Sequence, residues 1–501
     1  MAEAAYVAGL AIQNPNVLDS PRHSALVRVT HWIHTLSFFA LVVSGIGILL
    51  AHPRFYWGET GALGTPSLFD LPLPFLVTTP TYVGPSSWGR SLHFLSAWIC
   101  VLNGLLYAIS GLLSQHFRKN LLPVRSQLSG RSISRIVSNH LRMKRPSEEE
   151  SLTYNVLQRL AYLTVVFLFF PLMIWTGLAM SPSITSVFPI LVTALHGQQS
   201  ARTSHFFIAN FLVLFLLVHI AMVCLAGFAR RVRAMISGPK CRQEGALMSH
   251  ILSRRKLITT GLTTAAGVSG LGVAAVLAER YGLVPPDHGG IFGVGETMTY
   301  AAQRILMSRH SLAREFDRSQ ISKVAPINGN PPENETYQRL LAGGFKDWRL
   351  TVDGLVARPA SFSLADLKRF PSRTQITHQA CEEGWSFIAE WIGVQLSTVL
   401  NFVGVRPEAK YVVYFSLDEA WWDSLDMPDA LHPQTFLAYG MNGRELPTDH
   451  GAPVRMRVAR QLGFKSVKHL RQITVTDTLK NIRDGRGSAG PAIGYSWYGG
   501  I

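Results

Sequence analysis

Hydrophobic residues are distributed unevenly along the chain. Five stretches between His31 and Ala278, each of about 20 residues or slightly more, contain no Asp, Glu, Lys or Arg: His31–Ala51, Ser91–Gln115, Leu160–Met180, Thr203–Ala229 and Leu257–Ala278. A helix rises about 1.5 Å per residue, so roughly 20 apolar residues cross the hydrocarbon core of a bilayer. The pattern predicts five transmembrane helices, followed from Pro285 onward by a water-facing part.

The water-facing part has a different periodicity. From Trp348 onward the sequence contains short apolar runs with alternation and many β-branched residues, which predict strands. These runs are WRLTVDGLV, TQITHQAC, YVVYFSL, TFLAYGMNG, VRMRVA and LRQITVTDT. Asp353-Gly354 and Asn442-Gly443 mark turns, Ser363 is placed to cap a short helix, and another helix is expected between Glu296 and Phe316. The fold class is therefore multi-domain: an all-α membrane bundle followed by an α+β, mainly β, domain.

Charge indicates how the spans are oriented. The net charge is +16, but the basic residues lie in particular loops rather than on a face that would suit nucleic acid. Residues 114–155 and 230–256 each contain eight Lys or Arg, whereas residues 52–90 contain two and residues 181–202 contain one. The positive-inside rule places the N-terminus and both basic loops in the cytoplasm, so five spans leave the C-terminal domain on the opposite side.

The fifth predicted span has a further feature. Its start, SRRKLITTGLTT, resembles a twin-arginine export signal, and the alternative is an ordinary span with basic flanks. Both interpretations put the C-terminal domain outside the cytoplasm. The expected organisation is a cytoplasmic tail (1–22), a membrane domain (23–229), a basic loop (230–256), a fifth helix (257–280), a linker (281–325) and a C-terminal domain (326–501).

Histidines within the spans are candidate ligands, because ionisable residues are costly in a membrane. His205 and His219 are fourteen residues apart, which places them about 21 Å apart on nearly one helix face and suits two stacked haems. By depth, His93 matches His205 at the outer end and His31 matches His219 at the inner end. The alternatives are hydrogen bonding between helices, and His34 replacing His31 as a ligand.

The segments around these histidines resemble a known family. RVTHWIH, RSLHF, QRLAYLTVVFLFFPLMIWTGLAMS and ARTSHFFIANFLVLFLLVHI are similar to the bacterial di-haem cytochrome b family that includes the membrane subunits of nickel-iron hydrogenases and formate dehydrogenases. The resemblance covers roughly residues 23–227. It implies two b haems that carry electrons across the membrane and exchange them with quinone.

One cysteine stands apart from the other three. Cys100 and Cys224 lie in predicted spans and Cys241 in a cytoplasmic loop, so Cys381 has no partner for a disulfide in its compartment. It is either a buried apolar-like cysteine or a thiolate bound to a soft metal. No His or Cys cluster surrounds it in the sequence, so such a metal would have to bring its other sulfur ligands.

The segment THQACEEGW resembles the molybdenum-binding segment of the sulfite oxidase fold family, closest to the exported subfamily that includes the periplasmic methionine sulfoxide reductase. Further matches are EWIGVQLSTVL, WRLTVDGLVARPASFSLADL, TDHGAPVRMRV and LGFKSVKHLRQITV, over about residues 326–477. The resemblance implies that Cys381 and one molybdopterin dithiolene bind molybdenum. Carried over by position, the residues that contact the pterin or its phosphate are Asn328, Ser416, His450, Arg455, Ser466, Val467 and Lys468.

One departure from the family bears on the substrate. This chain has Ile327-Asn328-Gly329 where sulfite oxidases have Arg-Asn-His, so it lacks the arginine that helps to hold sulfite. Sulfite oxidation is therefore not expected. Three tryptophans, Trp385, Trp421 and Trp422, line a less charged pocket or belong to the core. Glu382 and Glu383 have no assigned role.

The sequence thus predicts a membrane-bound molybdenum oxidoreductase of the bacterial inner membrane. We expect it to exchange electrons between quinone and an exported Mo-molybdopterin site through two b haems, with oxygen-atom transfer such as S-oxide or N-oxide reduction. A small-molecule oxo donor or acceptor is the expected substrate. The direction of electron flow and the oligomeric state stay open, and the alternative is a non-catalytic electron-transfer module that serves a partner protein.

Overall fold

The computed structural model describes residues 24–71, 88–123, 156–225, 227–237, 276–287 and 293–501, with a few positions between 128 and 138. The twin-arginine segment, Cys241 and the predicted fifth span up to residue 275 lie outside these residues.

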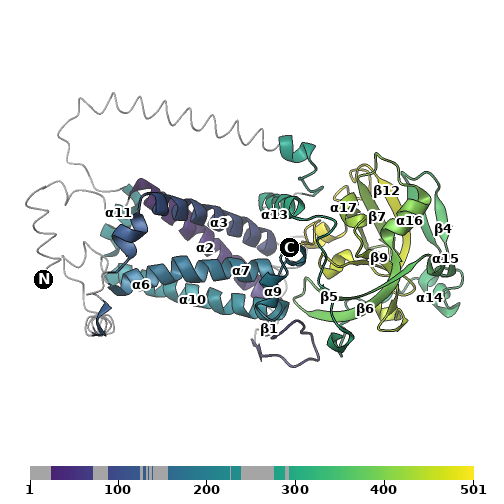
Figure 1. Ribbon diagram of the computed structural model, residues 1–501, viewed down its shortest axis with the longest axis horizontal. Helices are drawn as coiled ribbons and strands as arrows, with labels where there is room; N and C mark the ends of the chain where they lie inside the picture. Colours follow the sequence, from purple (N-terminus) through teal and green to yellow (C-terminus); the bar gives the residue numbers. More distant parts are fainter. Residues whose placement is uncertain are drawn as a thin grey trace, which may run out of the picture. The chain divides into compact units, whose positions relative to one another are not determined.

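Among the residues described, four long apolar helices form the N-terminal part (Figure 1). They are α2 (Ala25–Ala51), α3 (Gly89–Leu113), α10 (Gln198–Leu225) and a composite third helix made of α6 (Val156–Thr164), a π-helical turn (Val165–Phe169) and α7 (Phe170–Ala179). By length and composition all four can cross a membrane. Their large apolar side chains are exposed along their lengths, as lipid-facing residues are. The first four predicted spans are therefore confirmed as helices.

Shorter elements lie between and after these helices. They are β1 (Arg54–Phe55), β2 (Phe69–Asp70), a π-helical turn (Phe117–Leu121), α8 (Pro182–Val187), α9 (Ile190–Thr193), α11 (Phe228–Ser237) and α13 (Gly293–Leu306). The predicted helix at Glu296 is thus present as α13, but it ends at Leu306 rather than Phe316.

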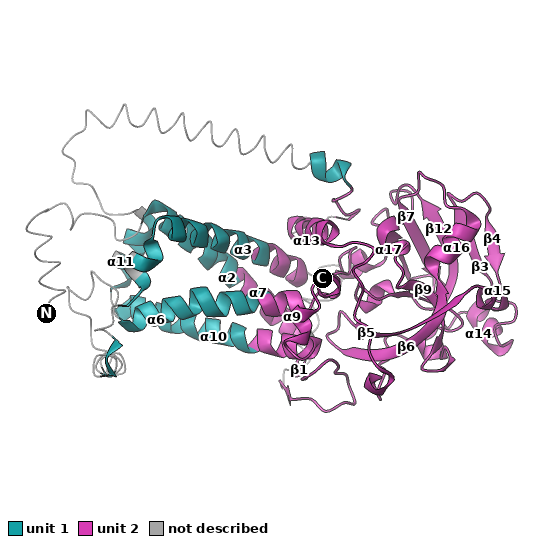
Figure 2. Ribbon diagram, viewed as in Figure 1, with its two compact units in different colours: residues 1–39, 97–174, 207–281 teal, residues 40–96, 175–206, 282–501 magenta. Residues whose placement is uncertain are grey.

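The chain divides into two compact units, and the division crosses the long helices (Figure 2). Unit 1 contains residues 1–39, 97–174 and 207–281, and unit 2 contains residues 40–96, 175–206 and 282–501. The end of each long helix that belongs to unit 2 is called its outer end below. Unit 2 therefore combines the outer helix ends with the whole C-terminal domain.

The C-terminal domain contains two five-stranded sheets. The first has the order β10-β9-β6-β5, with β11 also paired to β9, and the second has the order β4-β3-β12-β7-β8. All pairs are antiparallel except β12 with β3. The strands are β3 (Leu350–Gly354), β4 (Ala360–Phe362), β5 (Ser372–Ala380), β6 (Ser386–Gln395), β7 (Tyr411–Ser416), β8 (Trp422–Asp426), β9 (Thr435–Met441), β10 (Arg444–Glu445), β11 (Arg455–Val458) and β12 (Leu470–Thr476).

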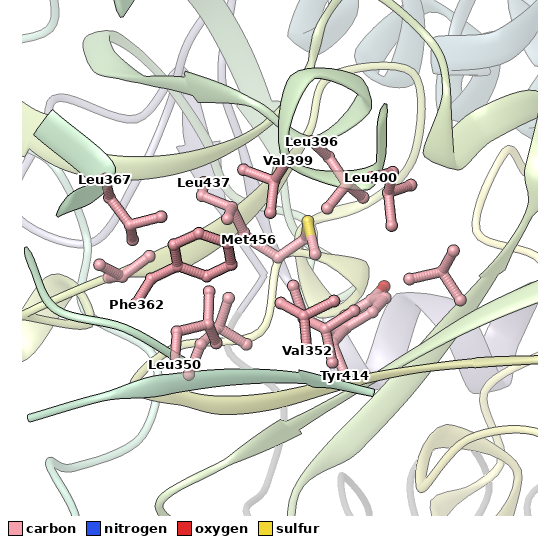
Figure 3. Close-up of a cluster of buried hydrophobic side chains, with 14 of the residues drawn as sticks. Leu350, Val352, Phe362, Leu367, Leu396, Val399, Leu400, Tyr414, Leu437 and Met456 are labelled. Carbon is pink, nitrogen blue, oxygen red and sulfur yellow. The ribbon is translucent and has the colours of Figure 1, made fainter. Parts of the chain in front are cut away.

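The main core of this domain is built from both sheets and a helix (Figure 3). Its helices are α14 (Glu335–Ala342), α15 (Leu364–Arg369), α16 (Leu396–Val403) and α17 (Met427–Ala430), with short 3-10 turns at residues 318–320, 448–450, 463–465 and 490–493. Val352 of β3 and Tyr414 of β7 face Leu437 and Met456 of the other sheet, and Val399 of α16 joins them. These five side chains are completely buried. Burial of this apolar surface holds the two sheets together.

Local pattern predicted most of these strands. Each of the six predicted runs contains a strand, Ser363 accepts a hydrogen bond from the Asp366 amide as the predicted cap, and Asn442-Gly443 joins β9 to β10. The ten-residue strand β6 was not predicted, although it is the longest in the domain. Its side chains are buried on both faces, so its sequence lacks the alternation by which a strand is recognised.

Candidate redox sites

The outer histidine pair, His93 of α3 and His205 of α10, lies within unit 2. The centroids of the two rings are 6.5 Å apart. Two imidazoles that share one metal ion through bonds of about 2 Å have their centroids roughly 6 Å apart. The spacing therefore accommodates an iron atom between the two rings.

Hydroxyl groups orient the rings of this pair. Ser44 Oγ lies 3.0 Å from His93 Nδ1, and Thr176 Oγ1 lies 2.9 Å from His205 Nδ1. Ser44 donates its proton to the Ala40 carbonyl at 2.7 Å, so it accepts from His93 Nδ1. His93 Nε2 then keeps its lone pair for a metal. Ligating histidines are commonly held in this way through the other ring nitrogen.

Glycines flank the same two rings. A Cβ atom at Gly45 of α2 would lie 3.9 Å from His93 Cε1, and one at Gly177 of α7 would lie 3.6 Å from His205 Cε1. A longer side chain at either position would fill the space beside an imidazole edge. A planar macrocycle bound between the histidines needs that space, so the residues present fit a haem.

The inner histidine pair, His31 of α2 and His219 of α10, lies within unit 1. Its ring centroids are also 6.5 Å apart. Phe215 stacks on His219 at 5.8 Å, and Tyr162 packs edge-on against it at 6.3 Å. Trp32 packs edge-on against His31. This pair has the same spacing as the outer pair, but aromatic rings surround it.

His34 is engaged elsewhere in unit 1. Its Nε2 lies 3.2 Å from Cys100 Sγ and its Nδ1 lies 3.0 Å from Asn103 Nδ2, both on α3. Asn103 also donates to the Thr30 carbonyl at 2.8 Å. Both ring nitrogens of His34 therefore have partners between helices. The structure brings His31, rather than His34, opposite His219.

Cys381 lies in the turn between β5 and β6. The turn closes through hydrogen bonds from the Cys381 amide to the Trp385 carbonyl (2.9 Å) and from the Gly384 amide to the Cys381 carbonyl (3.0 Å), with Gly384 at a φ of 82°. Such a positive φ suits glycine. The Asn328 amide group is 3.6 Å from Cys381 Sγ. Burial, followed by the Glu383 and Glu382 charges, raises the pKa of the Cys381 thiol, so a bound cation is needed to keep a thiolate here.

Lys468 connects Asn328 to the loop before β11. Its ammonium group donates to the carbonyls of Asn328 (2.6 Å), Gly329 (3.2 Å) and Asp449 (3.0 Å). Burial, with Arg455 nearby, lowers the pKa of Lys468 to about 8. A Cβ at Gly451 would lie 2.9 Å from Lys468 Cβ, so only glycine allows the loop to lie this close. The cluster thus places an ammonium group beside Asn328, the residue that contacts Cys381.

Two guanidinium groups are buried on one face of β11. Arg455 donates to the carbonyls of His450 (2.9 Å) and Ser466 (2.8 Å), and burial lowers its pKa to about 10. Arg457 donates to the His378 carbonyl (2.7 Å), and burial, followed by Arg455, lowers its pKa to about 9. Neither forms an ion pair with a described acidic residue. Buried cations without a carboxylate favour an anion, so this site suits a phosphate.

The remaining predicted residues belong to the same cluster. Ser416 donates to the Lys468 carbonyl at 2.9 Å, and Ser466 Oγ accepts from the Val458 amide at 3.1 Å. The Val467 side chain is buried in the main core, so only its backbone is available to a ligand. Burial lowers the pKa of His450 to about 4, so this ring is neutral at pH 7. The structure therefore brings all the carried-over residues together, while their roles stay predictions.

Sequence reasoning missed Arg457. It is two residues from Arg455 on the same strand, and positions i and i+2 share a face. That alternation is the signal that would have found it. Alternation shows that Arg455 and Arg457 share a face, and only the fold shows that this face is buried.

Packing defines the surroundings of the three tryptophans and of Glu382. Trp422 is buried in a core cluster and Trp421 packs against the main core, so both are core residues, whereas Trp385 is half-buried and donates to Glu383 at 2.9 Å. Glu382 is buried and forms an ion pair with Arg90 at 2.8 Å. Among the residues described, no group of three His, Cys, Asp or Glu could hold a metal by itself, so a metal at Cys381 needs ligands from a cofactor.

Two family matches divide the chain between them. Residues 22–238 match the family described as prokaryotic cytochrome b561, and residues 340–482 match the oxidoreductase molybdopterin binding domain. The first contains both histidine pairs, and the second contains Cys381 and the clustered cations. Haem b and a molybdopterin are therefore the cofactors to which these two parts correspond.

Individual relatives match one part each. YedZ1 of Azospira oryzae, which carries the provisional name of a protein-methionine-sulfoxide reductase subunit, is 34% identical over 195 residues, covering 39% of this chain and 70% of the relative. MsrP of Ralstonia nicotianae, named as the catalytic subunit of protein-methionine-sulfoxide reductase, is 34% identical over 145 residues, covering 26% of this chain and 44% of the relative.

A solved structure also matches in part. The sulfane dehydrogenase SoxCD from Paracoccus pantotrophus is 30% identical with a TM-score of 0.26, and the match covers 26% of this chain and 39% of the other. The chain thus spans less than half the length of MsrP and of SoxCD. The chain is an oxidoreductase that belongs to the prokaryotic cytochrome b561 family and carries a molybdopterin-binding oxidoreductase domain in the same polypeptide.

Proposed function

We propose that this enzyme takes electrons from membrane quinol, passes them through two b haems, and reduces an S-oxide or N-oxide at a molybdenum site. The inner pair, His31 and His219, holds one haem, and the outer pair, His93 and His205, holds the other. Cys381 binds the molybdenum of the molybdopterin. The C-terminal domain faces the periplasm of a bacterial inner membrane.

The observation that carries this proposal is the equal spacing of the two histidine pairs in a chain that also contains the Cys381 cluster. Both pairs have ring centroids 6.5 Å apart, which supports two haems rather than one. The names of YedZ1 and MsrP both refer to protein-methionine-sulfoxide reductase, which supports an S-oxide as the substrate. The basic loops at residues 114–155 and 230–256 support the orientation.

The reaction balances as follows. An S-oxide, two electrons and two protons yield a thioether and water, and a quinol supplies the two electrons with release of two protons. Molybdenum bound by a dithiolene and one thiolate supplies two-electron oxygen-atom transfer, while each haem carries one electron at a time. The protein therefore has to position the haems and the molybdenum site, and to stabilise the charges of the Cys381 thiolate and the pterin phosphate.

The chain's own residues meet these needs. Asn328 donates toward the Cys381 sulfur and favours its thiolate form. Arg455 and Lys468 provide the positive charge for an anionic pterin phosphate. Neutral His450 offers a hydrogen bond without adding a charge. The absence of an arginine before Asn328 makes the site less suited to a sulfite dianion.

Haem spectroscopy on the full-length protein tests the proposal. Membranes are reduced with a short-chain quinol, and methionine sulfoxide, dimethyl sulfoxide or trimethylamine N-oxide is then added, whereas sulfite is added to separate membranes whose haems are oxidised. We expect an S-oxide or N-oxide to reoxidise the b haems, and sulfite to leave the oxidised haems unreduced.

Cys381→Ser is the matched variant. It is expected to keep quinol-driven haem reduction and to lose S-oxide-driven reoxidation, because it removes the one protein thiolate that the proposal places on molybdenum. Reoxidation at the normal rate in this variant contradicts the proposal.

A further inference from the structure

The turn that contains Cys381 is held by the outer ends of the two helices that carry the outer histidine pair. We call residues Cys381–Ser386 the Cys381 turn. All contacts described here lie within unit 2.

Arg90 makes the first connection. It is the second residue of α3, and its guanidinium forms ion pairs with Glu382 at 2.8 Å and with Glu296 of α13 at 3.3 Å. The three side chains are between 2% and 9% exposed, so water screens these charges little. Ser91 donates to Glu296 at 2.7 Å. Both carboxylates thus gather at the N-terminus of α3, where the helix dipole favours negative charge.

The start of α10 makes the second connection. Gln199 donates to the Gly384 carbonyl at 3.0 Å and to Ser386 Oγ at 2.8 Å. Arg202 reaches the Gly384 carbonyl at 3.4 Å and also donates to the His52 carbonyl at 2.6 Å, just after α2. The start of α10 and the end of α2 are therefore tied to the same turn.

The loop after α2 closes the arrangement. Gly61 and Ser386 exchange backbone hydrogen bonds of 3.1 and 2.9 Å. Ser386 Oγ donates to the Glu59 carbonyl at 3.2 Å. A Cβ at Gly384 would lie 2.9 Å from the His52 ring, so glycine allows this close approach. Three separate segments thus fix one turn.

The positions of the two arginines relate the turn to the outer histidines. Arg90 is three residues before His93, and Arg202 is three residues before His205. Three helical residues span about 4.5 Å along the axis, so each arginine is one turn from a proposed haem ligand. At the other end of the ion pair with Arg90, Glu382 directly follows Cys381 in the chain.

We propose that Arg90 and Arg202 are positioning residues that clamp the Cys381 turn to the outer haem site, so that electrons pass directly between these two centres within one chain. This inference rests on the proposed function. The inference gives Glu382 the role of the carboxylate that pairs with Arg90. No soluble carrier is needed between the haem and the molybdenum site.

Stopped-flow measurements on the full-length protein in nanodiscs test the electron-transfer part. Protein whose haems have been reduced by quinol is mixed with methionine sulfoxide, and the reoxidation of the haems is followed. Arg90→Gln should slow this step by on the order of tenfold or more, because rates fall steeply when reacting groups are displaced by about 1 Å. The rate with reduced viologen, a donor that bypasses the haems, should change by less than about twofold in the same variant.

Two further variants provide a second test of the Arg90–Glu382 contact and a control. Glu382→Ala removes the connection to the turn but leaves Arg90 paired with Glu296, so it tests the clamp if Arg90→Gln fails to fold. Arg54→Gln is the control. The Arg54 side chain forms an exposed ion pair with Asp70, and Arg202 contacts only the backbone carbonyl of Arg54, which the substitution keeps. Arg54→Gln should match the wild type.

Hydrogen exchange provides a readout independent of activity. The peptide covering the Cys381 turn should exchange faster in Arg90→Gln and Glu382→Ala than in wild type, and its exchange should be unchanged in Arg54→Gln.

Two results in Arg90→Gln and Glu382→Ala would overturn the inference. One is unchanged hydrogen exchange of this peptide in both variants, and the other is a rate of haem reoxidation within about twofold of wild type in both. A wild-type rate of haem reoxidation that rises with protein concentration also overturns it, because transfer within one chain is first order. Failure of viologen-driven S-oxide reduction in the wild type counts against the proposed function, while the exchange result still decides the clamp.

Discussion

The outer and inner histidine pairs have the same ring spacing but different surroundings. Hydroxyl groups of Ser44 and Thr176 meet the Nδ1 atoms of the outer pair, whereas aromatic rings pack around the inner pair. His31 Nδ1 has no hydrogen-bond partner among the residues that the structure describes. The same ring spacing thus occurs in two distinct environments among the four long helices.

The two pairs also differ in what else their compact unit contains. The outer pair shares unit 2 with the Cys381 cluster and the arginine clamp, and the inner pair shares unit 1 with the hydrogen-bonded group of His34, Cys100 and Asn103. The outer environment is therefore charged and connected to the catalytic domain. The described rings that pack against the inner pair are those of Trp32, Tyr162 and Phe215.

The largest expected effect separates the pairs directly. His205→Ala should remove the outer haem and His219→Ala the inner haem, so each variant should keep about half of the haem, because the one histidine left at the site would not hold the haem by itself. Pyridine haemochrome analysis of purified protein measures this. His34→Ala is the control and should keep both haems. Full haem content in either ligand variant contradicts the pairing.

A second prediction concerns pH and applies to unit 2 alone. Burial lowers the pKa of Lys468 from 10.5 to about 8, so the folded, cofactor-free protein binds fewer protons than the unfolded chain between these values. Stability from this group should therefore rise as the pH increases from about 8 to 10, because the cost of burying the charge disappears. A bound phosphate should cancel the trend by favouring the charged lysine.

Thermal unfolding of the cofactor-free and loaded full-length protein at pH 7.5 and 9.5 measures this difference. Lys468→Met should flatten the pH dependence of the cofactor-free form. Identical slopes with and without cofactor would show that Lys468 does not meet the phosphate.

A third prediction tests the hydroxyl group beside the outer pair. Ser44→Ala should raise the midpoint potential of the outer haem, because loss of the acceptor makes His93 a weaker donor to ferric iron. The rise should be roughly 60 mV at most, which corresponds to a tenfold change in a one-electron equilibrium. Spectroelectrochemical titration should show this shift in one haem only. A shift of the inner haem instead would reverse the assignment.

The smallest expected effect is in unit 1. Asn103→Leu should break the contacts to His34 and Thr30 and destabilise the bundle by about 1 kcal/mol, the usual size of a hydrogen bond between membrane helices. Both haems should remain. Loss of the inner haem in this variant would show that His34 takes part in binding it.

Sequence pattern predicted the elements that depend on short-range periodicity. Strand β12 alternates between buried and partly buried positions, β7 is a short apolar run, and four spans are long enough and apolar enough to be recognised by length. Strand β6, which is buried on both faces, was missed, and the expected helix at Glu296 ended early. These misses occur where tertiary packing, rather than local pattern, decides the conformation.

The sequence by itself determined which residues can carry the chemistry. The fourteen-residue interval between His205 and His219 places both on nearly one helix face, and the predicted order of spans separates Cys381 from the other cysteines. Both depend only on local geometry and on the membrane as a solvent. Neither required knowledge of how distant segments pack.

Only the tertiary structure decided the partners of these residues. His31 rather than His34 faces His219, Arg457 points inward from β11, and Glu382 meets Arg90 although 292 positions separate them in the chain. Contacts between residues so far apart depend on the packing of whole elements, which local periodicity does not encode. The physical reason is that ring contacts, inward-facing strand positions and buried ion pairs all require two or more distant segments to pack together.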